Sequence, residues 1–274
     1  EKPFSKGLFA SIAYTKSMAG NLHDGGGDQP LGAYQNTPTV QVLNDPTLSY
    51  ASYVMPDRVI GTLSYRKEYF KHLATTISLL YQGSADYRFS YVYGADFNRD
   101  GVTGNDLIYI PKDARNTAEI TFVPTAAING IVYTAAQQGQ LFEDYINQDK
   151  YLKKHRGQYA ERNGAQAPWR NQLDMKFMQD IFVKAGKSRN TFQFTVDIFN
   201  FGNMLNPGWG KVKNTNATSI LVPQNPTSLV PGGTVVPTFR LATAQNQIIT
   251  RTFRDNVTTT STYSVQFGLR YIFN

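Results

Sequence analysis

Residues 96–101 place oxygen-bearing side chains at alternate positions and then a glycine. The order is Asp, Asn, Asp, Gly, which matches the first half of a calcium-binding loop, D-x-N-x-D-G. The complete loop ends in a glutamate, where this chain has Leu107, with Asp106 one residue earlier. The competing interpretation is an ordinary turn rich in Asp and Asn. We predict a structural Ca²⁺ with no catalytic role, held by Asp96, Asn98, Asp100, the Val102 carbonyl and Asp106.

Side chains that could support zinc binding or catalysis are either absent or far apart in the sequence. The chain has no cysteine, which excludes disulfides, thiolate zinc sites and a thiol nucleophile. Its three histidines, His23, His72 and His155, are far apart and lack metal-ligand spacing. No spacing of Ser, His and Asp supports a catalytic triad. We therefore predict that the chain is not an enzyme, with no catalytic and no cofactor-binding residues.

The net charge of +7 raises the question of nucleic-acid binding. The only dense basic run lies between residues 150 and 162, and no nucleic-acid motif accompanies it. We interpret this run as a solvated loop surface and expect no nucleic-acid partner. Arginine and aromatic residues nearby could contact a sugar or peptide, but packing of a large loop would use the same residues. We favour packing, and assign no substrate-binding role, for Arg156, Tyr159, Arg162 and Trp169.

The clearest secondary-structure pattern in the sequence lies at the end of the chain. From residue 263 onward every second residue is apolar, and the residues between are mostly polar. Alternation over this length marks a β-strand with two unlike faces. Aromatic residues stand at both ends of the apolar face with aliphatic ones between, as in a strand that faces lipid and crosses two interfaces. The apolar residues are Tyr263, Val265, Phe267, Leu269, Tyr271 and Phe273.

Five further segments alternate in the same way, and their connections are sorted by length. In chain order the connections are long, short, long, short and long, as in outer-membrane barrels with short periplasmic turns and long extracellular loops. Within the middle long connection, apolar residues at helical spacing predict a helix over residues 137–154. The predicted strands are 7–16, 57–66, 73–81, 169–181, 192–199 and 261–274, and the long connections are 17–56, 83–168 and 201–260.

These patterns predict an all-β fold, an antiparallel transmembrane β-barrel in the outer membrane of a Gram-negative bacterium, with long extracellular loops. About six membrane strands cannot close a barrel, since the smallest have about eight, and an open edge in lipid leaves backbone groups unsatisfied. The chain begins at Glu1 with neither a methionine nor a signal peptide. We therefore expect residues 1–274 to be the C-terminal portion of one larger barrel domain.

Four segments, in this order, resemble the C-terminal region of SusC-type TonB-dependent transporters. The combination is more specific than any single run, and the resemblance covers about residues 60–274. The first two segments include the residues of the Asp-rich loop, and the last begins within the fifth predicted strand and continues beyond it. They are residues 91–101 (YVYGADFNRDG), 105–111 (NDLIYIP), 156–169 (RGQYAERNGAQAPW) and 197–206 (DIFNFGNMLN).

The resemblance implies a barrel of about 22 strands with an N-terminal plug domain, which this chain lacks. Family members import oligosaccharides or oligopeptides and draw energy from the inner membrane through TonB, which would contact the missing N-terminal part. They work with a surface lipoprotein of the SusD type, and dimers of such transporter–lipoprotein pairs are also compatible with the resemblance. The expected partners are thus a SusD-like lipoprotein, TonB, membrane lipid and a glycan or peptide substrate.

Two other functions remain compatible with the strand pattern. A passive porin would use the same strands without a plug or energy source. A soluble β-sandwich binding module is the third reading, although a sandwich has no need to sort its connections by length. The substrate is not specified by the sequence, because specificity lies in variable loops.

Overall fold

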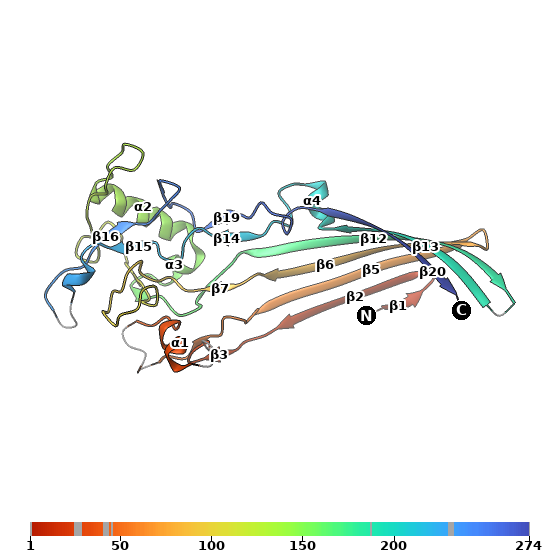
Figure 1. The fold of residues 1–274 in the computed structure, drawn as a ribbon, viewed down its shortest axis with the longest axis horizontal. Helices are drawn as coiled ribbons and strands as arrows, with labels where there is room; N and C mark the ends of the chain where they lie inside the picture. The colour runs from red at the N-terminus through yellow and green to blue at the C-terminus, as the bar shows by residue number, and fades with distance from the viewer. Residues whose placement is uncertain are drawn as a thin grey trace.

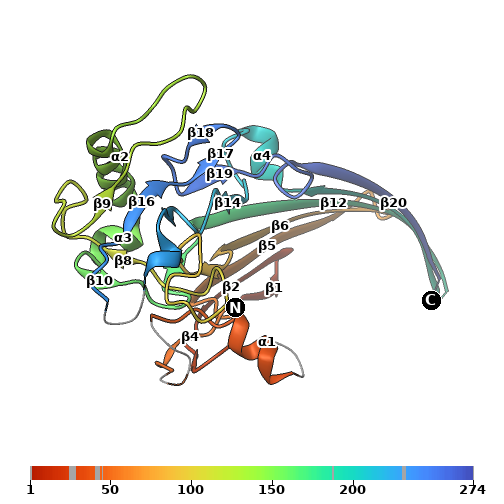
Figure 2. The same ribbon diagram turned by 60° about the vertical axis from the view of Figure 1, so that its left-hand side comes forward.

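The computed structural model describes residues 2–24, 29–40, 44, 46–186, 188–229 and 233–273. Its main feature is an antiparallel sheet of seven strands. Each strand pairs with the strand of this sheet that comes next in the sequence. Figures 1 and 2 show long strands that run side by side and bend together along their length. These strands are β1 (Lys2–Ser5), β2 (Leu8–Lys16), β5 (Asp57–Tyr69), β6 (Leu73–Ala85), β12 (Trp169–Ala185), β13 (Ser188–Phe199) and β20 (Ser264–Phe273).

All six predicted strands are present, and most are longer than predicted. The prediction of about six strands is one too few, because β1 forms a hairpin with β2. This strand has only four residues and contains Pro3, so period-two alternation could not reveal it. Its turn uses Lys6 and Gly7, both at positive φ. The short turn predicted at residues 184–190 is shorter still, and its residue 187 lies outside the described residues.

The sheet is open among the residues that the structure describes. Strand β1 lies at one edge and β20 at the other, and these two do not pair. The all-β, antiparallel character of the prediction is therefore confirmed, whereas no closed barrel is formed by these strands. Strands that face lipid must have both edges paired, so a barrel built on this sheet requires further strands.

The three long connections gather at one end of the sheet, here called the cap (residues 17–56, 86–168 and 200–263). The β5–β6 and β12–β13 turns, the β1 hairpin and the end of β20 lie at the opposite end (Figure 1). The cap contains short strands that pair mostly within it: β3 (Gly20–Asn21), β4 (Ser49–Tyr50), β7 (Arg88–Phe89), β8 (Tyr109–Ile110), β9 (Thr121–Phe122), β10 (Gln158–Tyr159), β11 (Ala165–Gln166), β14 (Lys213–Thr215), β15 (Leu221–Pro223), β16 (Thr238–Leu241), β17 (Thr243–Ala244), β18 (Gln247–Ile248) and β19 (Phe253–Asp255).

The helix predicted over residues 137–154 is confirmed, with one break. It is divided at Asp149, whose side chain caps the second part by accepting from the Tyr151 and Leu152 amides. The first part starts with a capping box between Thr134 and Gln137. The two parts are α2 (Ala135–Gln148) and α3 (Lys150–Lys154). Two short helices and one 3₁₀ turn were not predicted: α1 (Pro30–Gln35), α4 (Phe201–Leu205) and η1 (Pro226–Ser228).

The main hydrophobic core lies in the cap. Tyr91, Phe142 and Ile146 are fully buried there, together with Leu221 from the last long connection. This core draws on the second and third connections, and Val40 of the first packs against it. The cap is thus a folded unit, since long connections without a core of this kind would not recover their ordering entropy.

Candidate functional site

One face of the seven-stranded sheet is apolar from β5 to β20. The strand registers place Tyr65 of β5 beside Ile77 of β6, which pairs with Phe177 of β12. The same row continues through Val196 of β13 to Phe267 of β20. The Phe267 side chain is 69% exposed. A continuous apolar face of this extent is unusual on a surface in water and marks contact with lipid or with another protein; we call it the apolar face.

Aromatic side chains stand at both ends of the apolar face. Next to the cap, Tyr81, Trp169 and Trp209 line one shallow groove. The Tyr81 hydroxyl and the Trp169 indole N–H both donate to Asn171 Oδ1, at 2.6 and 2.9 Å, so each ring has an apolar body and a satisfied polar group. This arrangement suits a membrane–water interface. At the opposite end of the same face the aromatic residues are Phe192, Tyr271 and Phe273.

The other face of the sheet is polar, and two ion pairs connect neighbouring strands across it. Arg66 Nη1 lies 3.0 Å from Asp180 Oδ2, and Lys176 Nζ lies 3.0 Å from Asp197 Oδ1. Gln193 Nε2 donates to Asp180 Oδ1 at 2.8 Å. A sheet with one lipid-compatible face and one hydrated face is what the wall of an aqueous channel requires.

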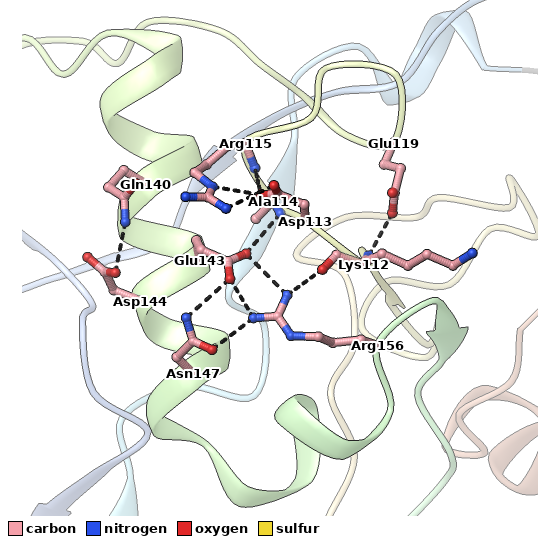
Figure 3. A network of polar contacts seen from close by, with 10 residues as sticks. All are labelled: Lys112, Asp113, Ala114, Arg115, Glu119, Gln140, Glu143, Asp144, Asn147 and Arg156. Carbon is pink, nitrogen blue, oxygen red and sulfur yellow. Dashed lines mark hydrogen bonds and ion pairs between the residues drawn. The ribbon is translucent and has the colours of Figure 1, made fainter.

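In the cap, Arg156 holds α2 against a preceding loop (Figure 3). Its Nη2 lies 2.6 Å from Glu143 Oε1, and its Nη1 donates to the Lys112 carbonyl at 2.7 Å. Glu143 also accepts from the Ala114 N–H at 3.0 Å. Burial raises the pKa of Glu143, but the Arg156 and Ala114 bonds outweigh it and leave that pKa below its usual value. Packing accounts for these contacts of Arg156.

Two of the other residues considered as ligand contacts, Arg162 and Tyr159, also make packing contacts. Arg162 is buried, with Nη1 3.1 Å from Asp24 Oδ2. The Tyr159 ring packs edge-on against Tyr109, with centroids 5.5 Å apart. Trp169 belongs to the apolar face described above. These side chains come from different elements and do not converge on one pocket.

The Asp-rich loop folds as a series of turns closed by its own side chains. Asp96 Oδ1 accepts from the Asp100 N–H at 3.2 Å, and Asp96 Oδ2 accepts from the Gly101 N–H at 3.0 Å. Asp100 Oδ1 accepts from the Val102 N–H at 2.9 Å, and the Asp100 N–H also donates to Asn98 Oδ1 at 2.9 Å. Val102 therefore enters the turn network through its N–H. The local geometry agrees with the Asx-turn interpretation.

Asp106 closes the loop from its far end. Its Oδ2 accepts from the Phe97 N–H at 2.7 Å, while its Oδ1 is buried without a hydrogen-bond partner. Burial is the main cause that raises the pKa of Asp106 to about 6; the Phe97 N–H opposes the rise, and the negative charges of Asp100 and Asp96 add to it. The structure thus brings Asp106 to the same loop as the predicted Asp96, Asn98 and Asp100.

Sequence reasoning missed Asn105. Its Nδ2 donates to Asp100 Oδ2 at 3.3 Å, and its Oδ1 is a second buried oxygen without a hydrogen-bond partner. The signal available was an amide side chain directly before Asp106. In the ranges that the structure describes, no three His, Cys, Asp or Glu side chains form a ready-made metal site, so the Ca²⁺ site stays a prediction.

No family model, curated protein or solved structure matches this chain. Within the described ranges, no helix is long and apolar enough to cross a membrane.

Proposed function

We propose that this chain is the C-terminal part of an outer-membrane β-barrel that imports oligosaccharides or oligopeptides in a TonB-dependent manner. The observation that supports this function best is the two-faced sheet. Its apolar face carries aromatic residues at both ends, and its polar face carries the ion pairs Arg66–Asp180 and Lys176–Asp197. The resemblance of residues 60–274 to SusC-type transporters supports the import of these substrates and its dependence on TonB.

In this proposal β1 and β20 are joined to strands that precede this chain. Both are edges of an otherwise paired sheet, and each unpaired backbone group in lipid costs several kcal/mol. The plug domain and the segment that contacts TonB would belong to the same N-terminal part. The polar face would then line the lumen.

The cap would lie outside the cell and form the docking surface for a SusD-like lipoprotein. The three long connections lie together at one end of the sheet (Figure 1). They carry exposed apolar side chains that their own core leaves uncovered, among them Tyr53, Val236 and Val257. A lid-like partner would bury such residues, and the family resemblance names its type. Two transporter–lipoprotein pairs would form the larger assembly.

Energy dependence tests the transport mechanism. The full-length protein should be expressed in cells and supplied with fluorescent oligosaccharides and oligopeptides of several sizes. For a TonB-dependent importer, deletion of TonB or addition of a protonophore abolishes uptake. For a passive porin, which the polar face would also serve, uptake continues under both treatments.

A soluble β-sandwich is separated by its behaviour without detergent. A sandwich covers its apolar face with a second sheet, whereas Phe267 and its neighbours in the apolar face are exposed in the described part of the chain. The full-length protein should therefore aggregate when detergent is removed. A monodisperse, detergent-free monomer would contradict the proposed function.

A further inference from the structure

Asn105 and Asp106 lie where segments from all three long connections meet. The Thr39 N–H donates to the Asn105 carbonyl at 2.7 Å, and the Leu107 N–H donates back to the Thr39 carbonyl at 2.8 Å. On the other side the Tyr93 N–H donates to the Asp106 carbonyl at 2.8 Å. These backbone bonds fix the main chain of both residues, and with it the positions from which their side chains extend.

The third connection joins the same junction through an isolated backbone bridge to the segment that contains Tyr93. The Gly94 N–H donates to the Leu221 carbonyl at 2.9 Å, and the Val92 N–H donates to the Thr218 carbonyl at 3.2 Å. Arg99, within the Asp-rich loop, donates from Nη1 to the Thr227 carbonyl. Anything that stiffens this loop therefore stiffens the contact of all three connections.

Two oxygen atoms at this junction lack the hydrogen-bond donor that burial demands. Asn105 and Asp106 are each 1% exposed, and neither Oδ1 atom accepts a hydrogen bond. A buried acceptor without a partner costs about 1–3 kcal/mol, and more when it is charged. These two atoms belong to adjacent residues and are both acceptors only. A cation is the kind of partner that each of them lacks.

The charge of the loop is also uncompensated. Asp96, Asp100 and Asp106 contribute three carboxylates, and in the described ranges no lysine or arginine forms an ion pair with any of them. Arg99, the one cation in the loop, is directed to the Thr227 carbonyl instead. Carboxylate and amide oxygens without thiolate or imidazole select a hard divalent cation.

We propose that loop 96–106 binds one Ca²⁺ and that the bound ion locks the three long connections of the cap together. The ligands are carboxylate or amide oxygens, and Asn105 replaces the Val102 carbonyl of the loop motif. Small side-chain rotations of Asp96 and Asp100, which now accept backbone N–H bonds, complete the coordination. Calcium is favoured over magnesium because the oxygens come from a flexible turn and outnumber what a hydrated Mg²⁺ uses. The ligand set is Asp96, Asn98, Asp100, Asn105 and Asp106.

Binding is tested with the full-length transporter in detergent after removal of divalent cations by EGTA. Isothermal titration with CaCl₂ should give one site with a dissociation constant of about 10⁻⁴–10⁻³ M or tighter, the range of extracellular calcium modules. MgCl₂ at the same concentrations should bind at least about tenfold more weakly. No calcium heat at the protein concentrations of the titration, or equal binding of both ions, would overturn the proposal.

The locking role has its own readout, tryptic cleavage after Arg99, which is exposed within the loop. Calcium at about ten times its dissociation constant should slow this cleavage about tenfold, because binding suppresses local opening by the factor 1 + [Ca²⁺]/Kd. Asp106→Asn keeps an acceptor for the Phe97 N–H but removes the charge, and should abolish the protection. Asp144→Asn, on the exposed side of α2, is the matched control and should keep it.

A second variant tests the site independently in case Asp106→Asn does not fold. Asp100→Asn changes a less buried ligand and should weaken calcium binding in the same titration, while its circular dichroism spectrum in EGTA should match that of the wild type. If either ligand variant binds Ca²⁺ as tightly as the wild-type protein does, the site is wrongly assigned. Loss of protection in Asp144→Asn would equally contradict it. Since none of these measurements involves transport, the calcium site and the proposed function can fail separately.

Discussion

Gln266 and Phe267 are adjacent in β20, yet their cross-strand partners belong to opposite environments. Gln266 pairs with Asp197, which forms an ion pair with Lys176. Phe267 pairs with Val196, which belongs to the apolar face. One residue step thus separates the hydrated face of the sheet from the face that we assign to lipid.

This relationship predicts unequal effects of the same substitution at the two positions. Phe267→Arg places a charge in the middle of the apolar face and should lower the free energy of unfolding by about 2–4 kcal/mol. Gln266→Arg, beside Asp197, should change it by less than about 1 kcal/mol. Unfolding of the full-length protein in lipid vesicles by urea measures both. Effects of similar size would contradict the assignment of the two faces.

The Glu143–Arg156 pair predicts an acid-sensitive cap. The folded-state pKa of Glu143 lies below its ordinary value of 4.5, so the pair stabilises the cap above about pH 4.5 and loses that stabilisation as the pH falls through the lowered pKa. Glu143→Gln removes the charge and should cost about 1–3 kcal/mol at pH 7. It should also flatten the pH profile below pH 4.5.

Proteolysis of the cap in the full-length protein, followed across pH, measures this effect. Asp144→Asn, on the same helix but exposed, should keep the wild-type profile. An unchanged profile in Glu143→Gln would show that the pair does not determine the acid sensitivity.

Gly7 should be intolerant of a side chain. It has φ +83 in the β1–β2 turn, and a Cβ there would overlap the Arg66 carbonyl oxygen, which is backbone and cannot move aside. Gly7→Ala should destabilise by about 1–3 kcal/mol. Gly61→Ala is the control, because a Cβ there meets its nearest atom, Tyr81 Cβ, at 3.8 Å. Equal urea midpoints for the two variants would disprove this account of the turn.

Residues 1–274 contain no cysteine, so single-cysteine variants report the topology once any cysteine in the rest of the full-length protein is replaced. Ser228 lies in the cap and Ser188 at the opposite end of the sheet, and both are exposed. On intact cells a membrane-impermeant maleimide should label Ser228→Cys, and should label Ser188→Cys only after the outer membrane is permeabilised. The reverse result would place the cap in the periplasm.

The long strands could be predicted because each carries its signal locally. In β20 the alternation of apolar and polar residues needs no information from elsewhere, and α2 shows its apolar spacing in the same way. β1 is too short for such a signal. The pairing of β16 with β9 joins residues Thr238 and Thr121 in a parallel register, which only the folded cap defines.

The residues of the candidate calcium site also differ in whether their signal is local in the sequence. Asp96, Asn98 and Asp100 are recognisable because the loop motif is local. Asn105 was missed because its burial depends on pairing with Thr39, a residue of another connection. The motif position of Val102 predicted a carbonyl ligand, but the structure shows a role only for its N–H.

The most direct test of the membrane-spanning sheet measures whether each face of β20 contacts lipid or water. Nitroxide labels should be placed at Leu269→Cys and Arg270→Cys in the full-length protein reconstituted into lipid vesicles. We predict that the label at residue 269 is relaxed by oxygen, which concentrates in lipid, and is shielded from a water-soluble nickel chelate. The label at residue 270 should show the opposite preference. Equal accessibility of both labels to the nickel chelate would contradict a membrane-spanning sheet.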